Sequence, residues 1–232
     1  MSKNFVENIK GVHPPKTSLG MAKMQALAQA AEKLFTQSSF FEVSVSDICR
    51  EAHTAVGTFY IYFETKTDIY RYLVEDYQRR IKRSLAESIA GCKSRYERER
   101  AGIKSFVRFS VENPNVYHIV WGSLAVEKDL FVNYYMSFAD SYARALSSDL
   151  HELLSEDVMT LAYMLMGIAS FLGLRGMFET LNNEQIDKME KSKVEKFDIT
   201  HVHEEYLLFV LTAIALLVLE FLVKYIVLKR IP

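Results

Sequence analysis

The sequence has few cysteines, no surplus of either charge and no motif of a common enzyme class. Its two cysteines, Cys49 and Cys92, form no CxxC pair and have no histidine pair nearby at zinc-ligand spacing. This excludes a disulfide framework and predicts free thiols in a reducing, cytoplasmic compartment. With 28 basic and 29 acidic residues, the whole chain resembles neither a highly basic nucleic-acid binder nor an acidic tail. Any charged surface must be local.

Enzyme signatures are missing as well. The sequence contains no GxSxG, no Walker loop, no GxGxxG after a strand and no HExxH. The histidines of "HVH" at 201–203 can contact a metal, but beside Glu204 and Glu205 they are more typical of a solvated helix start. We therefore expect no catalysis, no cofactor and no metal site. Residues 1–16 lack the apolar core of a signal peptide and predict a flexible polar arm.

Helix signals follow one another along the chain, whereas strand signals and internal repeats are scarce. Half of the residues are apolar, so the chain can bury a sizeable core. Capping residues and apolar residues at helical spacing predict an all-α fold of about nine helices, with a polar loop over 181–199. The helices are expected near 17–38, 44–52, 57–63, 67–90, 103–113, 114–121, 130–150, 161–178 and 206–228.

One segment raises the possibility of a membrane anchor. The run "LLFVLTAIALLVL" (207–219) continues past Glu220 as "FLVKYIVL". A transmembrane helix needs about 20 apolar residues, and a charge at its centre costs about 2.5–3.5 kcal/mol. Glu220 and Lys224 would both lie within the span, at the spacing of a helical ion pair. These charges favour a helix buried in a protein assembly, and a membrane-associated helical protein anchored by 206–228 is the alternative.

Residues 44–63 predict two short helices joined by a tight turn. Ser44 and Asp47 have the spacing of a capping box, and a second helix follows over Gly57–Phe63. A preceding helix can brace them. This is the helix-turn-helix arrangement, in which the second helix enters the major groove of DNA.

The segment "VSDICREAHTAVGTFYIYFETKTDIY" resembles the DNA-binding segment of TetR-family transcriptional regulators, above all in "GTFYIYF" followed by Lys66. The specific resemblance covers residues 20–70. It implies an all-helical homodimer with a helix-turn-helix domain over 17–66 and an effector-binding and dimerisation domain over 67–232. It also implies a repressor that a small hydrophobic or aromatic effector releases from a palindromic DNA operator.

Under this interpretation, the second short helix is anchored by Phe59 and Phe63 and offers its other side chains to DNA. Tyrosine hydroxyls and Lys66 suit phosphates, and Thr58 and Ile61 suit base edges. The predicted DNA-binding residues are Ser44, Ser46, Thr54, Ala55, Val56, Thr58, Tyr60, Ile61, Tyr62 and Lys66. The alternative is that the tyrosines merely cap a helical core.

The turn departs from the family pattern. Residues 53–56 read "HTAV", where similar proteins commonly have a glycine, an aliphatic residue, a serine and a basic residue. His53 is expected to take the left-handed conformation that glycine adopts freely. Ala55 and Val56 remove a hydroxyl and a cation. Residues 1–66 contain seven basic and six acidic residues, which is a weak electrostatic footprint for DNA.

The later helices carry candidate effector and dimer residues. Pockets have largely apolar walls with a few polar groups, although most such residues belong to plain core. The candidate ligand-binding residues are Tyr117, His118, Trp121, Phe131, Tyr135, Phe138, Met164 and Arg175. An effector would act by favouring the conformer with wrongly spaced recognition helices, with the helix over 67–90 as the lever.

The two apolar helices expected over 161–178 and 206–228 should pair with their symmetry mates in a four-helix dimer interface. The interface candidates are Gly167, Ser170, Gly173, Leu211, Leu216 and Phe221. Small residues of this kind also serve internal helix packing, which is the alternative here.

Overall fold

The computed structural model describes residues 3–147 and 155–179. Over these residues the chain forms nine α-helices, and the only strand-like pairing is an isolated antiparallel bridge between Val12 and Phe63. The all-α prediction is confirmed. The helices are α1 (Lys3–Glu7), α2 (Ser18–Gln37), α3 (Val45–Glu51), α4 (Val56–Tyr62), α5 (Lys66–Ile89), α6 (Arg95–Glu112), α7 (Asn115–Val126), α8 (Lys128–Ser147) and α9 (Ser155–Phe178).

Side-chain caps fix the start of several helices. The hydroxyl of Thr17 accepts a hydrogen bond from the amide of Gly20 at 3.0 Å, where α2 begins. Reciprocal capping boxes join Ser44 to Asp47, Thr65 to Asp68 and Ser94 to Glu97 at the starts of α3, α5 and α6. Each cap satisfies amide groups that have no partner inside the helix. The cap at Ser44 agrees with the capping box expected from the sequence, and α5 begins one residue before the expected start at 67.

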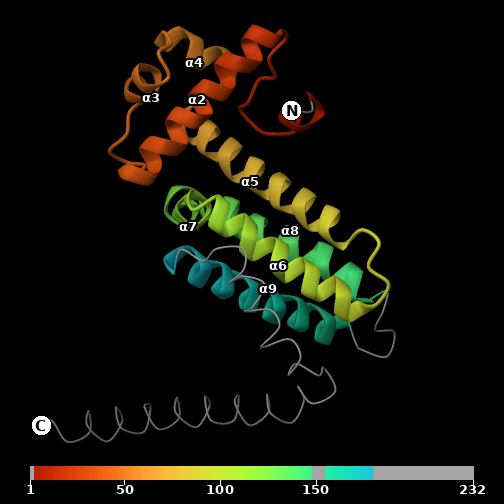
Figure 1. The fold of residues 1–232 in the computed structure, drawn as a ribbon. Helices are drawn as coiled ribbons and strands as arrows, with labels where there is room; N and C mark the ends of the chain where they lie inside the picture. Colours follow the sequence, from red (N-terminus) through yellow and green to blue (C-terminus); the bar gives the residue numbers. More distant parts are fainter. Residues whose placement is uncertain (1–2, 148–154, 180–232) are drawn as a thin grey trace, which may run out of the picture. The chain divides into compact units, whose positions relative to one another are not determined.

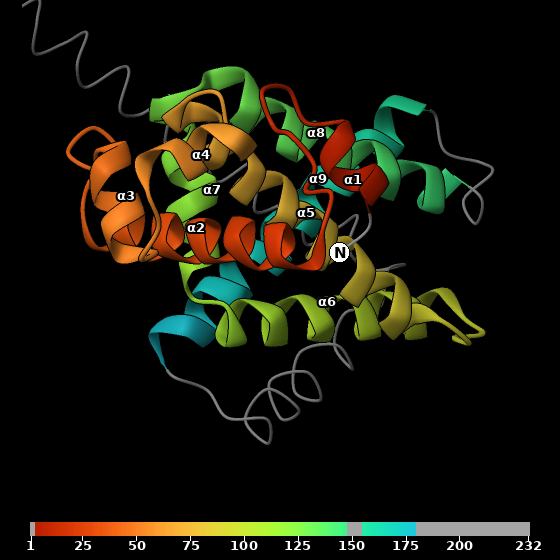
Figure 2. The same ribbon diagram turned by 90° about the horizontal axis from the view of Figure 1, so that it is seen from above.

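The helices pack around α5. In Figure 1, α2, α3 and α4 gather near the start of α5, while α6 and α8 run beside it and α9 packs against both of them. Figure 2 shows α7 beside α2, and α7 also contacts α5 and α8. The Tyr70 hydroxyl of α5 donates to the Ile119 carbonyl of α7 at 2.7 Å. Helix α7 therefore touches both the helix-turn-helix region and the later helices.

A continuous core joins these elements. Phe59, Phe63, Met24, Leu27 and Ile48 are fully or almost fully buried around the short helices. The same cluster of contacts continues through α5 to side chains of α7 and α8. Burying one such apolar side chain contributes about 1.5–3 kcal/mol, so the short helices α3 and α4 are stabilised by packing rather than by their own length.

The N-terminal residues do not form the flexible arm expected from the sequence. Helix α1 lies within them, and Val6, Ile9 and Val12 are buried. The Phe5 ring packs against Tyr72 of α5, with 6.2 Å between ring centroids. The three aliphatic residues recur every third position and place one apolar stripe against the helices. The polar residues between them obscured that stripe in the sequence.

The expected loop over 181–199 and terminal helix over 206–228 lie outside the described residues. Helix α9 is long and apolar enough over Val158–Phe178 to cross a membrane, as judged by length and composition only. Core helices of soluble proteins meet the same criterion. Helix α9 packs against α6 and α8, and 17% of its apolar window is buried.

Candidate DNA-binding surface and internal cavity

The turn between α3 and α4 has the predicted left-handed residue. His53 has a φ of 52°, and its amide donates to the Arg50 carbonyl at 3.2 Å. The next amide, that of Thr54, donates to the Cys49 carbonyl at 2.9 Å. These two bonds close the end of α3, so α4 starts in a new direction after residues 52–55.

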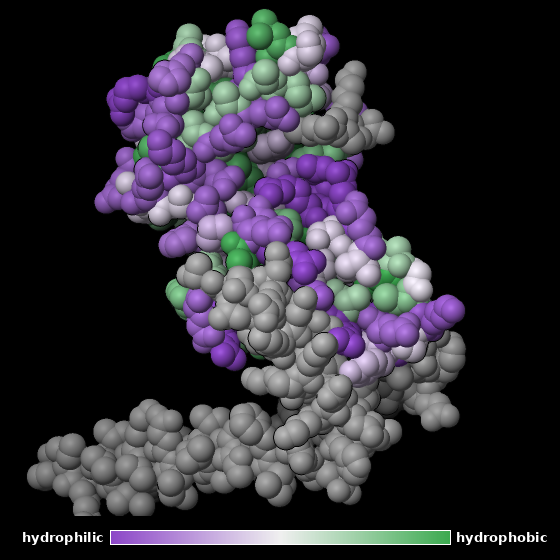
Figure 3. All heavy atoms as spheres, in the orientation of Figure 1, coloured by the Kyte–Doolittle hydropathy of each residue, from purple (hydrophilic) through white to green (hydrophobic). Residues whose placement is uncertain are grey.

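Helix α4 has one buried and one exposed face. Phe59 is fully buried on this helix, and Phe63 is fully buried just beyond its end. On the opposite face, Tyr60 and Ile61 are 54% and 60% exposed, and Val56 is also exposed. A Cβ placed on Gly57 would meet no atom within 4 Å. Figure 3 shows apolar (green) patches among polar (purple) side chains on the surface of this region. Single exposed apolar side chains are common on protein surfaces, whereas a group of them on one helix face, as formed by Val56, Tyr60 and Ile61, marks a candidate contact surface.

The prediction that Tyr62 projects outward is wrong. Its side chain is only 6% exposed, and its hydroxyl would lie 3.1 Å from a Cβ added at Gly20 of α2. Residues three and four positions apart share a helix face, so Tyr62 follows Phe59 inward. Thr58 is half-buried for a similar geometric reason. The outward positions are instead 56, 57, 60 and 61.

Lys66 does not present a free cation. Its Nζ donates to the carbonyls of Phe40 and Val43, each at 2.7 Å, and lies 4.3 Å from the centroid of the Phe40 ring. Burial lowers the pKa of this ammonium group. The sequence assigned Lys66 to a DNA phosphate, but the side chain caps two main-chain carbonyls of the loop between α2 and α3.

The other predicted DNA contacts divide into exposed and internal groups. Ser44, Ser46 and Ala55 are exposed, although the Ser44 hydroxyl is engaged in capping α3. The hydroxyl oxygen of Thr54 is buried, which removes it from the surface. Ala55 precedes α4 without any side-chain cap.

Few cations surround this surface without an acidic partner. Arg50 pairs with Asp47, and Lys33 lies 2.6 Å from Glu51. Lys16 and Lys23 are exposed and make no ion pair within the described part of the chain. The hydrogen bond and charge of Lys33 lower the pKa of Glu51, so that carboxylate stays charged at neutral pH. The weak positive footprint expected from the sequence is therefore weakened further by local pairing.

A cavity of about 380 Å³ lies among α5, α6, α7, α8 and α9. Four of the candidate ligand residues line it: Tyr117, Trp121, Tyr135 and Phe138. The Trp121 Nε1 donates to the Tyr135 hydroxyl at 3.0 Å, and the Tyr117 hydroxyl donates to the Ser170 carbonyl at 2.6 Å. Burial raises the pKa of Tyr117 to about 12, so this hydroxyl remains a donor at neutral pH. The wall is almost entirely apolar.

The other candidate ligand residues do not reach the cavity. His118 is exposed on α7, and Arg175 is exposed and pairs with Glu179. Phe131 packs on Tyr135 outside the wall, and Met164 is half-buried elsewhere on α9. The sequence missed the wall formed by α6, including Ile103 and Phe106. Their apolar spacing was visible, but it does not distinguish a cavity wall from a filled core.

The candidate dimer residues also lie in different environments. A Cβ on Gly173 would come 2.6 Å from the Tyr117 hydroxyl and 2.7 Å from Ser110 Oγ, so Gly173 serves internal packing. The carbonyl of Ser170 accepts from Tyr117, and Ser170 lines the cavity. Gly167 faces open space. Leu211, Leu216 and Phe221 lie outside the described residues.

No group of three or more histidine, cysteine, aspartate or glutamate side chains within the described ranges is arranged to hold a metal ion.

Comparison with known proteins identifies the helix-turn-helix region. The family model described as "Bacterial regulatory proteins, tetR family" matches residues 27–73. The HTH-type transcriptional regulator YvdT of Bacillus subtilis is 36% identical over 62 residues, which are 27% of this chain and 31% of YvdT. YdgC of the same organism is 33% identical over 72 residues, 31% of this chain and 36% of YdgC. The chain thus matches about a third of the length of these curated relatives.

Solved structures extend the likeness to most of the fold. A TetR-family regulator from Syntrophomonas wolfei superposes with a TM-score of 0.64 at 22% identity, covering 76% of this chain and 95% of that one. The fatty acid degradation regulator FadR from Bacillus halodurans superposes with a TM-score of 0.62 at 15% identity, covering 75% of this chain and 93% of FadR. A regulator of fatty acid metabolism from Clostridium perfringens superposes with a TM-score of 0.60 at 20% identity, covering 71% of this chain and 94% of that one.

At these identities the structures show the shared fold alone. The family and its two Bacillus subtilis relatives are regulators, not enzymes. Together, residues 27–73 match the tetR family of bacterial regulatory proteins, and the described helices share the all-helical fold of solved TetR-like regulators.

Proposed function

We propose that the protein is a DNA-binding transcriptional regulator in which α4 reads the major groove. The observation that carries this proposal is the two-sided character of α4. Phe59 on this helix and Phe63 just beyond its end are buried, whereas Val56, Tyr60 and Ile61 are exposed on the other side. A tyrosine hydroxyl can donate to a phosphate or a base edge, and an isoleucine suits a thymine methyl group. Placement after a tight turn is the geometry of a recognition helix.

Regulation of a palindromic operator requires two such helices about 34–36 Å apart, and hence a dimer. Helix α9 supports this part of the proposal, because Tyr163, Ile168, Phe171 and Phe178 are exposed on it. Several large apolar side chains exposed along one helix favour a protein interface there. Gly167 lies on the open side of α9 and remains a candidate for close approach, together with Leu211, Leu216 and Phe221.

The cavity supports response to a hydrophobic or aromatic effector. Its volume and apolar wall fall in the range of small-molecule sites, and Trp121 and Tyr135 supply polar groups at the wall. Two structural neighbours bear names that refer to fatty acids, and a hydrophobic acyl chain is one molecule that fits such a wall. We propose that effector binding releases the protein from its operator, as expected of a repressor. This role places the protein in the cytoplasm.

The proposal is tested by selecting bound fragments from genomic DNA with the purified full-length protein. We expect recovered fragments to share a palindromic site. The Tyr60→Ala variant should then bind the selected site about 5- to 150-fold more weakly while keeping its melting temperature, because Tyr60 makes few internal contacts. The matched control is Tyr96→Ala, which truncates an exposed tyrosine on α6.

Recovery of random fragments, or equal affinity of both tyrosine variants and the parent protein, would contradict the role of α4. Cell fractionation distinguishes this proposal from the alternative, a membrane-associated protein anchored by residues 206–228. A soluble dimer without detergent supports the regulator, and sedimentation with membranes supports the anchor.

A further inference from the structure

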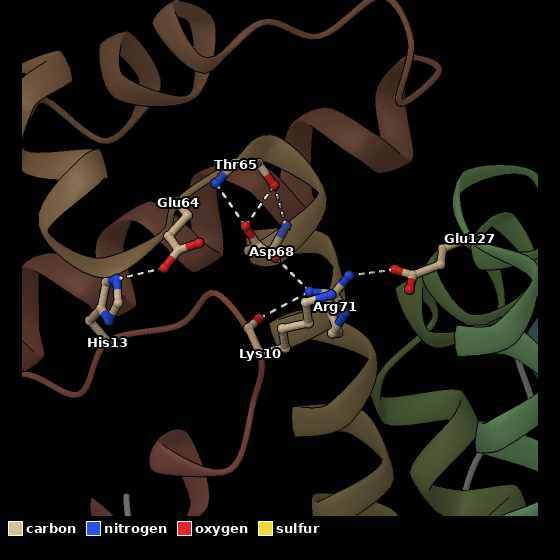
Figure 4. A network of polar contacts seen from close by, with 7 residues as sticks. All are labelled: Lys10, His13, Glu64, Thr65, Asp68, Arg71 and Glu127. Atoms are coloured by element: carbon tan, nitrogen blue, oxygen red, sulfur yellow. Dashed lines mark hydrogen bonds and ion pairs between the residues drawn. The ribbon is translucent and has the colours of Figure 1, made fainter.

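Arg71, in the second turn of α5, joins three separate segments of the chain. Its side chain is only 16% exposed. Nη1 donates to the Lys10 carbonyl at 3.0 Å and to Asp68 Oδ1 at 2.5 Å, and Nη2 donates to Glu127 Oε2 at 2.7 Å. Figure 4 shows the guanidinium between these three partners. The planar fork of arginine suits such multiple contacts, whereas a lysine ammonium is a single point of charge.

The first partner, Asp68, ties Arg71 to the exit of α4. Its other carboxylate oxygen accepts from the amide of Thr65 at 2.8 Å and from the Thr65 hydroxyl at 2.6 Å. Thr65 follows the end of α4 by three residues. The Asp68 side chain is 9% exposed, so both ends of this ion pair are largely removed from water. Asp68 therefore fixes the junction between α4 and α5 and orients Arg71 at the same time.

The second partner is the N-terminal segment. Gly11 has a φ of 70°, and a Cβ there would lie 2.4 Å from the Asp68 carboxyl group, so only glycine allows this approach. The amide of Glu64 donates to the Gly11 carbonyl at 3.0 Å, and the amide of His13 donates to the Tyr62 carbonyl at 2.8 Å. Residues 11–13 thus form a strap across the end of α4. The carbonyl of Lys10, held by Arg71, is the start of this strap.

The third partner, Glu127, lies where α7 ends. Its amide donates to the Ser123 carbonyl at 2.8 Å and closes α7. The same helix lines the cavity through Val116, Tyr117, Val120 and Trp121. A displacement of α7 by a molecule in the cavity would therefore act on the Glu127 carboxylate that Arg71 holds.

We propose that Arg71 is a positioning residue that connects the cavity wall on α7, through Glu127, to the strap and α4–α5 junction that hold the recognition helix. This inference rests on the proposed function of α4. Arg71 itself faces the inside of the network and makes no contact with DNA. Any change in its bond to Glu127 reaches the end of α4 through Asp68 and through the Lys10 carbonyl.

Hydrogen exchange of the full-length protein tests the connection without DNA or effector. The variant Glu127→Gln removes one charge at the end of α7 and keeps the side-chain shape. We expect the amides of His13 and Glu64, which Glu127 does not touch, to exchange about 2- to 30-fold faster, the range of perturbations within coupled networks. Exchange in α9 should be unchanged. Glu179→Gln, which removes the exposed ion pair with Arg175, is the matched control and should leave both amides as in the parent.

A uniform increase in exchange over the chain would show general destabilisation, and unchanged exchange at both amides would show no connection; either result overturns the proposal. Arg71→Lys keeps the charge without the fork and should accelerate the same two amides. If these amides exchange in Arg71→Lys as they do in the parent protein, a positive charge at position 71 is enough to hold the network, and the proposed role of the guanidinium fork is wrong.

DNA binding gives an independent readout with a fragment recovered by the genomic selection. Arg71→Lys should lower affinity about 2- to 30-fold while the slope of log K against log salt stays unchanged, because Arg71 contacts no phosphate. A slope reduced by about one would identify Arg71 as a phosphate ligand and overturn its positioning role. If no fragment is recovered, the proposed function fails, whereas the exchange experiment still decides whether the network connects α7 to the strap.

Discussion

Replacement of Lys66 by methionine separates a structural from a DNA-binding role for this lysine. Methionine keeps most of the apolar stem over Phe40 but removes the two hydrogen bonds to the carbonyls of Phe40 and Val43. Hydrogen bonds from a charged donor contribute about 1.5–3 kcal/mol each, and a partly exposed site favours the low end because water can replace the donor. The lowered pKa of Lys66 reflects a desolvation cost that offsets part of this gain.

The expected net loss in the free energy of unfolding is about 2–3 kcal/mol. For a chain of this size, that corresponds to a decrease in melting temperature of about 4–12 °C. Urea unfolding followed by circular dichroism measures the first quantity and a thermal scan the second. The salt dependence of operator affinity should stay the same, because the ammonium group is not available to a phosphate.

Lys23→Met is the matched control, since Lys23 is exposed on α2 and makes no ion pair within the described residues. Its stability should change by less than about 0.5 kcal/mol. The reasoning is refuted if Lys66→Met leaves stability unchanged and reduces the salt slope by about one. That outcome would instead support the phosphate contact that the sequence alone predicted for Lys66.

Three further predictions test other features of the fold. His53→Gly should raise the free energy of unfolding by about 0.5–1 kcal/mol in urea titrations, because the left-handed turn strains a residue with a Cβ. Gly173→Ala should destabilise by about 1–3 kcal/mol through its clash with Tyr117, whereas Gly57→Ala on α4, where a Cβ would meet no atom within 4 Å, should be neutral or stabilising. Burial raises the pKa of Glu75, so the native state keeps its proton to higher pH than the unfolded state, and the charged form costs stability above the native pKa. Glu75→Gln should therefore raise the melting temperature at neutral pH, and this gain should vanish below the ordinary glutamate value of 4.5.

The helix-turn-helix was predictable because its signals are local. The Ser44 and Thr65 caps lie within three residues of their partners, and the short connection between α3 and α4 leaves His53 little choice of backbone conformation. The phenylalanines at 59 and 63 define the inner face of α4 by spacing alone. Family resemblance rests on the same stretch, which is also the part that the family model matches.

The roles of Tyr62 and Lys66 were not predictable, because each depends on a partner distant in sequence. Tyr62 is buried by the start of α2, and Lys66 bonds to carbonyls 26 and 23 residues away. Either residue would suit a DNA phosphate if those partners were elsewhere. Likewise, apolar spacing identified the helices around the cavity but not which of their side chains leave space between them.

The sequence by itself determined the helical class, the starts of the short helices and the burial of Phe59 and Phe63, since these follow from hydrogen bonds and periodicity within a few residues. Only the tertiary structure decided that residues 11–13 form a strap and that Arg71 joins it to the end of α7. Such contacts require segments separated by as many as 61 residues to meet, and local patterns carry no information about which ones do.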